Sequence, residues 1–204
     1  AGASAVGDVS GAAVGLISGG ALAVASADSL LSANLLRVEA ASVGTLSAPV
    51  NTAVGTATVS SAGAIYLSET DAMTIGAVSV STQRFTGVVT NAVVSDAVQS
   101  DVVATADVVM VVAAGDLVLL DGADADGDAL RTTGGRVRLE TVLGSQVLGA
   151  DVVSAGSVSL ISGASLILGS LVDVVSGGDV YAVSGGSTQL ASVFSAVGPL
   201  FKRI

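Results

Sequence analysis

A short phrase recurs in the C-terminal half of the chain at nearly constant intervals. It combines a small residue, Gly, and alternating apolar residues, and it occurs as AGDLVL, GGRVRL, AGSVSL and GGDVYA. The glycines of these phrases follow one another after 20, 21 and 22 residues: Gly115, Gly135, Gly156 and Gly178. Short alternating segments and corners at a period near twenty predict a parallel β-solenoid, whose coils stack on one another. The strands of a β-sandwich would not place their glycines at such constant intervals.

The same phrase can be followed toward the N-terminus. AGAIYL places Gly63 in register, and ANLLRV places Asn34 there, because Asn shares with Gly an ability to adopt positive φ. Residues 16–32 also align without gaps on residues 160–176. Between Gly63 and Gly115 the signal weakens, with Gly87 the best candidate, so we expect longer turns or an irregular coil there.

These observations predict an all-β chain with one parallel β-helix domain over residues 1–198 and a C-terminal tail or cap over residues 199–204. The coils should contain about 20–24 residues each. Alternation within the phrases predicts one narrow core, with columns of stacked side chains from Leu117, Leu119, Val137, Leu139, Val158, Leu160 and Val180. Hydrophobic residues make up 51% of the chain and aromatic residues only 2%, which suits a thin core of many similar layers.

The mean hydropathy of +0.83 raises the question of a membrane-spanning helix. Residues 9–27 and 152–172 carry no charge and are long enough to cross a bilayer. Both segments are rich in Gly and Ser, and their larger residues alternate with small ones. We therefore expect strands in these segments and no insertion into a membrane.

Charge and residue types exclude several functions. The chain has 17 acidic and 7 basic residues, a net charge of -10, so nucleic acid is not an expected partner. It has no Cys and no His, which removes disulfides, thiolate metal sites and the usual general base and zinc ligand. It does not begin with Met and has no charged segment before its first apolar run, so we expect a mature product or a piece of a longer protein.

The strongest polar cluster is the segment DGADADGD, which holds Asp121, Asp124, Asp126 and Asp128. Carboxylates this close repel one another unless a cation or open solvent intervenes, and Ca²⁺ with its six to eight oxygen ligands would fit. The spacing is not that of an EF-hand. The alternative is a solvated corner loop, and we expect calcium binding here to be weak if it occurs. We expect no other cofactor.

Acidic and basic residues on one face of neighbouring coils could serve in catalysis. Asp116, Arg136 and Asp179 each follow a repeat glycine directly and should share an outward ladder position, with Asp116 near Arg136 on the next coil. An ion pair between stacked strands explains this arrangement more simply than an active site. Glu69 and Asp71 in SETDAM are interpreted as a polar turn. No phosphate-binding loop is evident, and we predict that the chain is not an enzyme.

Long stretches of the sequence, such as GGRVRLETVLGSQVLGADVVSAGSVSLISGASLILGS, resemble the repeat regions of giant bacterial surface proteins of the filamentous haemagglutinin-like and adhesin-like type. The resemblance consists of similar phrases at a similar spacing over most of residues 1–198, and it includes no diagnostic motif. It implies a right-handed parallel β-helix and an extracellular or cell-surface role in attachment, sheath or filament formation. It carries over no catalytic residue. The terminal GPLFKRI departs from the pattern.

The expected function is therefore a structural or adhesive rod segment of a large secreted or cell-surface bacterial protein. Residues 1–14 contain one charge and no amphipathic helix, so the first coil should be uncapped. Its partners would be the same protein, end to end, or further repeats, together with surface glycans. A calcium-dependent carbohydrate-binding module and a polysaccharide-degrading β-helix are the alternatives.

Overall fold

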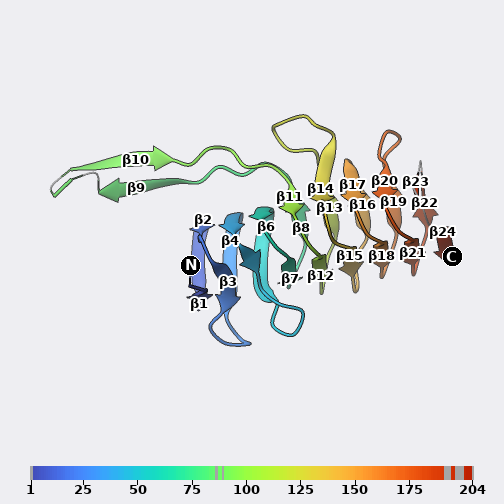
Figure 1. The fold of residues 1–204 in the computed structure, drawn as a ribbon, viewed down its shortest axis with the longest axis horizontal. Coiled ribbons are helices and arrows are strands. Elements are labelled where there is room, and N and C mark those ends of the chain that lie inside the picture. The colour runs from blue at the N-terminus through green and yellow to red at the C-terminus, as the bar shows by residue number, and fades with distance from the viewer. Residues whose placement is uncertain (1, 86, 89, 191–193, 196–199, 204) are drawn as a thin grey trace.

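The computed structural model describes residues 2–85, 87–88, 90–190, 194–195 and 200–203. In this part of the chain the regular structure is entirely β-strand, and 22 strands join one sheet in which every pairing is parallel. The sheet winds into a rod of stacked coils, with the N-terminus and the C-terminus at opposite ends (Figure 1). The prediction of an all-β parallel solenoid is confirmed.

The strands lie on three faces of the rod. The first face contains β1 (Ser4–Val6), β3 (Ala21–Val24), β5 (Ser42–Val43), β7 (Ile65–Glu69), β12 (Val108–Val112), β15 (Val137–Thr141), β18 (Val158–Ser162), β21 (Val180–Ser184) and β24 (Leu200–Arg203). The second contains β8 (Met73–Ile75), β13 (Leu117–Leu119), β16 (Gln146–Leu148), β19 (Leu166–Leu168) and β22 (Thr188–Gln189). The third contains β11 (Val102–Ala104), β14 (Asp128–Thr132), β17 (Asp151–Ser154), β20 (Val174–Ser176) and β23 (Phe194–Ser195).

Three long strands near the N-terminus continue around the corners between faces: β2 (Val9–Ile17), β4 (Leu30–Ala40) and β6 (Val50–Ser61). Along its length β6 pairs in turn with β7, β8 and β11, one strand on each face. β4 pairs with β6, and β2 pairs with β4. The first coils therefore have the same three-sided course as the later ones.

Backbone hydrogen bonds repeat from coil to coil. Val137 pairs with Val158, and Val158 pairs with Val180, so these coils advance by 21 and 22 residues. The amide of Val137 donates to the carbonyl of Ser157 over 2.9 Å, and the amide of Val158 donates to that of Asp179 over 2.9 Å. This is the predicted coil size, and the shared ladder satisfies the backbone groups of the paired strands.

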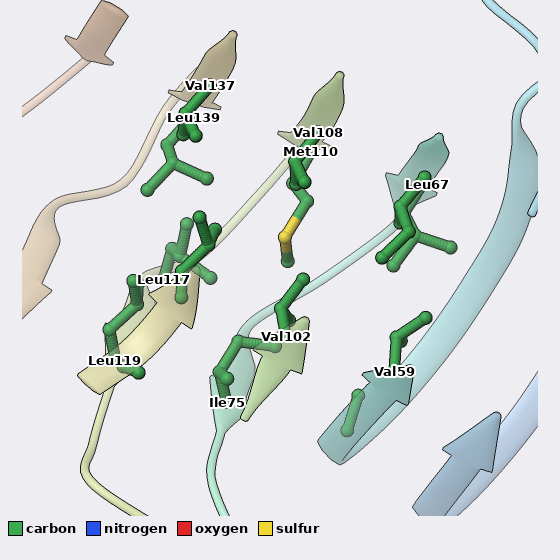
Figure 2. Packing of buried hydrophobic residues seen from close by; sticks show 14 of the residues in the cluster. Val59, Leu67, Ile75, Val102, Val108, Met110, Leu117, Leu119, Val137 and Leu139 are labelled. Carbon is green, nitrogen blue, oxygen red and sulfur yellow. The ribbon is translucent and has the colours of Figure 1, made fainter. Parts of the chain in front are cut away.

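Apolar side chains from the three faces meet inside the rod (Figure 2). Leu139 pairs with Leu160 and both are fully buried on the first face, so the predicted column is present. Leu117 and Leu119 are also buried, but the prediction that they continue this column is wrong. They lie on the second face, where Leu119 pairs with Leu148.

Leu117 and Leu119 were expected on the wrong face because two corners of a coil have similar sequences. Where the third face turns into the first, the hydroxyl of Ser154 donates to the carbonyl of Gly135 over 2.9 Å. Where the first face turns into the second, the hydroxyl of Ser162 donates to the carbonyl of Ser165 over 2.9 Å. In both corners a buried hydroxyl precedes a Gly and then a buried aliphatic residue. The phrase at Gly115 lies at the second kind of corner, where Val112 takes the place of the hydroxyl residue.

Two other assignments of phase are wrong for the same reason. Leu16 pairs with Val38 in the column of the third face, whereas Leu160, its partner in the gapless alignment, lies on the first. Asn34 lies inside β4 beside Gly55, where these strands turn from the first face to the second, and not at the glycine position that the repeat phrase assigned to it. Strands on different faces have similar alternation, so an alignment can match them without their being equivalent.

Two insertions interrupt the regular coils. The step from Ile65 to its ladder partner Val108 contains an antiparallel hairpin, formed by β9 (Ser81–Phe85) and β10 (Asn91–Ser95). Gly87 lies between these strands, so it is not a coil corner. The step from Val108 to Val137 contains residues 120–127, here called the acidic loop, between β13 and β14.

No helix in the described ranges is long and apolar enough to cross a membrane. Residues 9–27 and 152–172 instead contain strands β2 and β3, and β17 to β19. At the other end of the chain, β24 pairs with β21 and extends the first face. The predicted division into a domain over residues 1–198 and a tail or cap over residues 199–204 stays a prediction, and residues 196–199 and 204 lie outside the described residues.

Candidate metal centre

The acidic loop does not hold its four predicted carboxylates together. Asp121 and Asp124 are exposed and lie near the same point. Asp126 accepts a hydrogen bond from the amide of Asp128 over 2.9 Å. Asp128 itself is buried at the start of β14 and forms an ion pair with Arg131. The loop thus divides into two carboxylates that face a common centre and two that stabilise the end of the loop.

The third carboxylate at this centre belongs to Asp101, which precedes β11 on the preceding coil. Carboxylate oxygens of Asp101, Asp121 and Asp124 all lie within 4.8 Å of one another. β11 pairs with β14, so the residues just before these two strands are neighbours in space. The sequence analysis missed Asp101, since a lone Asp in the segment QSDVV has no local feature that marks it as a ligand.

Asp101 is held rigidly by its own backbone. Its φ of 63° lies in the left-handed region, which a non-glycine residue adopts at a cost in free energy. Its carbonyl accepts hydrogen bonds from the amide of Val59 over 3.0 Å and from the hydroxyl of Thr58 over 2.8 Å. These bonds to β6 hold the backbone of Asp101 in place beside the acidic loop.

The loop packs tightly on the residues beside Asp101. The amide of Ala123 donates to the hydroxyl of Ser100 over 2.9 Å. A Cβ atom at Gly122 would lie only 2.2 Å from the Cβ of Ser100, so glycine is required at this approach. The contact brings the loop close enough for its carboxylates to reach Asp101.

The electrostatics of the cluster are those of crowded negative charges. Burial raises the pKa of Asp101 to about 7, and the charges of Asp124, Asp126 and Asp121 add to the rise. A hydrogen bond from the amide of Gly122 lowers the pKa of Asp101, but by less than burial raises it. A buried carboxyl among other acids is costly to ionise without a cation, which makes this cluster the candidate metal centre of the described residues.

The predicted ion pair between Asp116 and Arg136 is not formed. Arg136 instead binds Asp107, with 2.7 Å between Nη2 and Oδ2, and hydrogen bonding to Arg136 holds the pKa of Asp107 below its usual range. Asp116 accepts the amide of Ser145 over 2.7 Å, on the second face. Asp179 is in the predicted position, one coil beyond Ser157. The change of partner follows from the corrected phase, which places Asp107 in the ladder position assigned to Asp116.

Outward Asp residues repeatedly tie one coil to the next. Asp107 accepts the amide of Arg136 over 2.9 Å, and Asp151 accepts the amide of Asp173 over 2.7 Å. Asp116 has the same role toward Ser145. A carboxylate that accepts a backbone amide stabilises the stacking of two coils. These acids therefore have a structural role that requires no substrate.

Glu69 is a third buried acid, beside Asp101 and Asp128, and its interpretation as part of a polar turn is wrong. Its side chain points into the rod and is only 1% exposed. The carboxylate accepts amides of Val54 over 3.2 Å, Thr70 over 3.0 Å and Asp71 over 3.3 Å. Burial outweighs these bonds and raises the pKa of Glu69 to about 7. Alternation along β7 places this residue inward.

A shallow groove of about 310 Å³ runs along the outside of the first face. It is lined by the ring of Tyr66, by Leu46 and by two paired guanidinium groups, those of Arg136 and Arg138. Asp107 is the carboxylate in this groove, and its lowered pKa makes it a poor general acid.

No family model, curated protein or solved structure matches this chain.

Proposed function

We propose that this chain is a structural or adhesive rod segment of a large secreted or cell-surface bacterial protein, with right-handed coils. The handedness rests on the strong preference of parallel crossover connections for the right-handed form. The proposed role and location agree with the resemblance of the repeats to filamentous haemagglutinin-like and adhesin-like surface proteins.

The proposal rests chiefly on the unpaired strand edges at both ends of the described rod. β1 pairs with β3 alone and β2 with β4 alone, so each has one edge without a strand partner. At the other end, β24 pairs with β21 alone. Unpaired parallel edges are templates for another strand. We propose that further coils, of the same protein or of a second copy, continue the ladder at these ends.

The hairpin supports an interaction beyond the first coil. Its base packs against β2, where a Cβ atom built at Gly15 would lie 3.5 Å from the Cβ of Val80. The segments that lead to the hairpin run along the rod, and β9 and β10 project past its N-terminal end (Figure 1). Phe85 and Val93 on the projecting part are 83% and 70% exposed. An isolated two-stranded hairpin is marginal in water, so we propose that its apolar side chains cover the coil that extends the rod.

The non-enzymatic character of the segment is part of this proposal. Outward carboxylates such as Asp107, Asp116 and Asp151 are used to hold neighbouring coils together. A polysaccharide-degrading β-helix needs two carboxylates converging on one cleft, with one of them able to donate a proton. The paired Asp107 in the groove of the first face does not meet that need.

Light scattering on the purified chain over a range of concentrations tests end-to-end association. We expect oligomers whose mean mass grows with concentration. The Leu16→Lys variant places a charge in the terminal layer of the core, where a stacked coil would bury it, and should abolish growth. The matched control is Ile17→Lys, because Ile17 is the next residue and its side chain is 61% exposed.

Circular dichroism of both variants verifies that the rod is still folded. A concentration-independent monomer of the unaltered chain would refute association between copies. Equal growth by the Leu16→Lys and Ile17→Lys variants would show that association does not use the terminal coil.

A glycan contact is a second candidate function, favoured by the groove of the first face. The ring of Tyr66 offers an apolar platform and the guanidinium groups of Arg136 and Arg138 offer hydrogen-bond donors. Because both Arg residues are paired with acids, we expect a neutral glycan. Glycan-array binding that is lost in Tyr66→Ala would support this contact, and binding unchanged by that substitution would oppose it.

A further inference from the structure

The centre formed by Asp101, Asp121 and Asp124 joins two insertions that are separate in the sequence. Asp101 ends the segment that returns from the hairpin, and Asp121 and Asp124 lie in the acidic loop. The two segments lead into β11 and β14, which are paired neighbours on the third face. Whatever binds these carboxylates together also binds the base of the hairpin to the acidic loop.

We propose that Asp101, Asp121 and Asp124 bind one Ca²⁺ ion, which fastens the acidic loop and the returning segment of the hairpin onto the rod. The proposal changes the ligand set expected from sequence, because it adds Asp101 and leaves out Asp126 and Asp128. It does not depend on the proposed rod function, since the ion would bind within one chain.

The buried carboxylate of Asp101 points independently to a ligand. The residue is only 3% exposed, and its Oδ1 atom has no hydrogen-bond partner and no contact with solvent. An unpaired buried carboxylate oxygen costs several kcal/mol in a folded protein unless a cation or donor compensates it. Its backbone is fixed by the bonds from Thr58 and Val59, so the side chain starts from a set position beside the acidic loop.

The spacing of the oxygens suits one shared ion. Calcium takes oxygen ligands at about 2.3–2.6 Å, so two ligand atoms on opposite sides of the ion lie roughly 5 Å apart. The three carboxylates lie within 4.8 Å of one another, which allows all three to contact a single ion. Backbone carbonyls of the loop and water molecules would complete the six to eight ligands that calcium needs.

The chemistry of the ligands selects the kind of metal. All three are carboxylates, and the chain contains neither His nor Cys, which are the preferred ligands of zinc and copper. Magnesium demands a nearly ideal octahedron and gives up its water reluctantly. A site built from one rigid residue and two residues of an exposed loop matches the flexible coordination of calcium better.

Isothermal titration of the metal-free 204-residue chain with CaCl₂ tests the site. We expect one ion per chain with a dissociation constant on the order of 10⁻⁴ M, and clearly weaker binding of MgCl₂. Asp124→Asn and Asp101→Asn should each weaken calcium binding by about tenfold or more, since each removes a charged ligand. Asp126→Asn is the matched control, because this carboxylate is exposed in the same loop and already bonded to the amide of Asp128.

Each result bears directly on the proposal. Asp124 is exposed, so its substitution leaves the fold intact even if Asp101→Asn destabilises the chain. Binding that is lost in Asp124→Asn and kept in Asp126→Asn supports the assignment. The assignment is overturned by equal binding in all variants, by loss in Asp126→Asn alone, or by no binding up to about 10 mM calcium. A dissociation constant below about a micromolar would place the site among dedicated sensors and contradict the weak binding proposed here.

Hydrogen exchange with and without calcium locates the ion. Bound calcium should slow exchange of the amides in residues 120–127 and 97–101 together, because one ion holds both segments. Slowed exchange elsewhere, with none in these two segments, would show that calcium binds at a different acidic site and would overturn the proposal.

Discussion

Replacing Glu69 with Gln should change how the stability of the rod depends on pH. The buried carboxyl has a pKa of about 7, against 4.5 in an unfolded chain. Below pH 4.5 the carboxyl is protonated in both states and has no effect. Between pH 4.5 and 7 the unfolded chain ionises while the folded chain keeps its proton, so the free energy of unfolding falls as pH rises. Above pH 7 the folded chain is ionised too, and the loss is complete.

The size of the effect follows from the shift. A rise from 4.5 to about 7 corresponds to roughly 3 kcal/mol of lost stability at neutral and alkaline pH. Gln has almost the same shape, keeps an acceptor for the amides of Val54 and Thr70, and does not ionise. The variant should therefore gain about 3 kcal/mol relative to the unaltered chain between pH 4.5 and 7.5.

Urea unfolding of both chains at several pH values between 4.5 and 8.5 measures this difference. Subtracting one curve from the other removes the contributions of the other buried acids, including Asp101. The matched control is Asp28→Asn, which alters an exposed carboxylate in a turn outside the strands and should change stability by less than about 0.5 kcal/mol. A difference between the Glu69→Gln and unaltered chains that stays constant over this pH range would refute the reasoning.

Three further substitutions test how the coils are held together, and the same unfolding measurements apply to each. Leu160→Ala removes a fully buried side chain from the first face and should cost about 2–5 kcal/mol, so a loss below 1 kcal/mol would contradict the packed core. Gly163→Ala would place a Cβ atom 2.0 Å from the carbonyl oxygen of Val142 and should cost about 1–3 kcal/mol, whereas Gly76→Ala, with no atom within 4 Å, should be nearly neutral. Arg136→Ala breaks the exposed ion pair with Asp107 and should cost less than about 1 kcal/mol, with a larger loss indicating that the pair organises the groove.

The regular coils could be predicted because their rules are local. Alternation of buried and outward residues, as in Val158 and Leu160, sets the strand and its inner side. The sequence of a hydroxyl residue, a glycine and an aliphatic residue sets the corner, as at Ser154 and Gly156. Both features are contained within about six residues of chain, so they can be recognised without knowing what lies beside them.

The face on which a segment lies could not be predicted, because two corners of each coil share that chemistry. Leu117 follows a glycine corner just as Val137 does, and only the pairing of strands shows that they belong to different faces. The hairpin was expected only as a longer turn or an irregular coil, since its exposed strands have no core pattern of their own.

The all-β class, the size of the coils and the presence of an acidic loop could be read from short segments, since alternation, corner chemistry and composition are local properties. The contact of Asp101 with Asp121 and Asp124, the pairing of Asp107 with Arg136 and the position of Glu69 inside the rod depend on how the coils stack. These relations join residues on different coils, or depend on which side of a strand is closed by its neighbours. Stacking of coils brings such residues together, and insertions of different lengths shift the spacing in sequence by which they could be recognised.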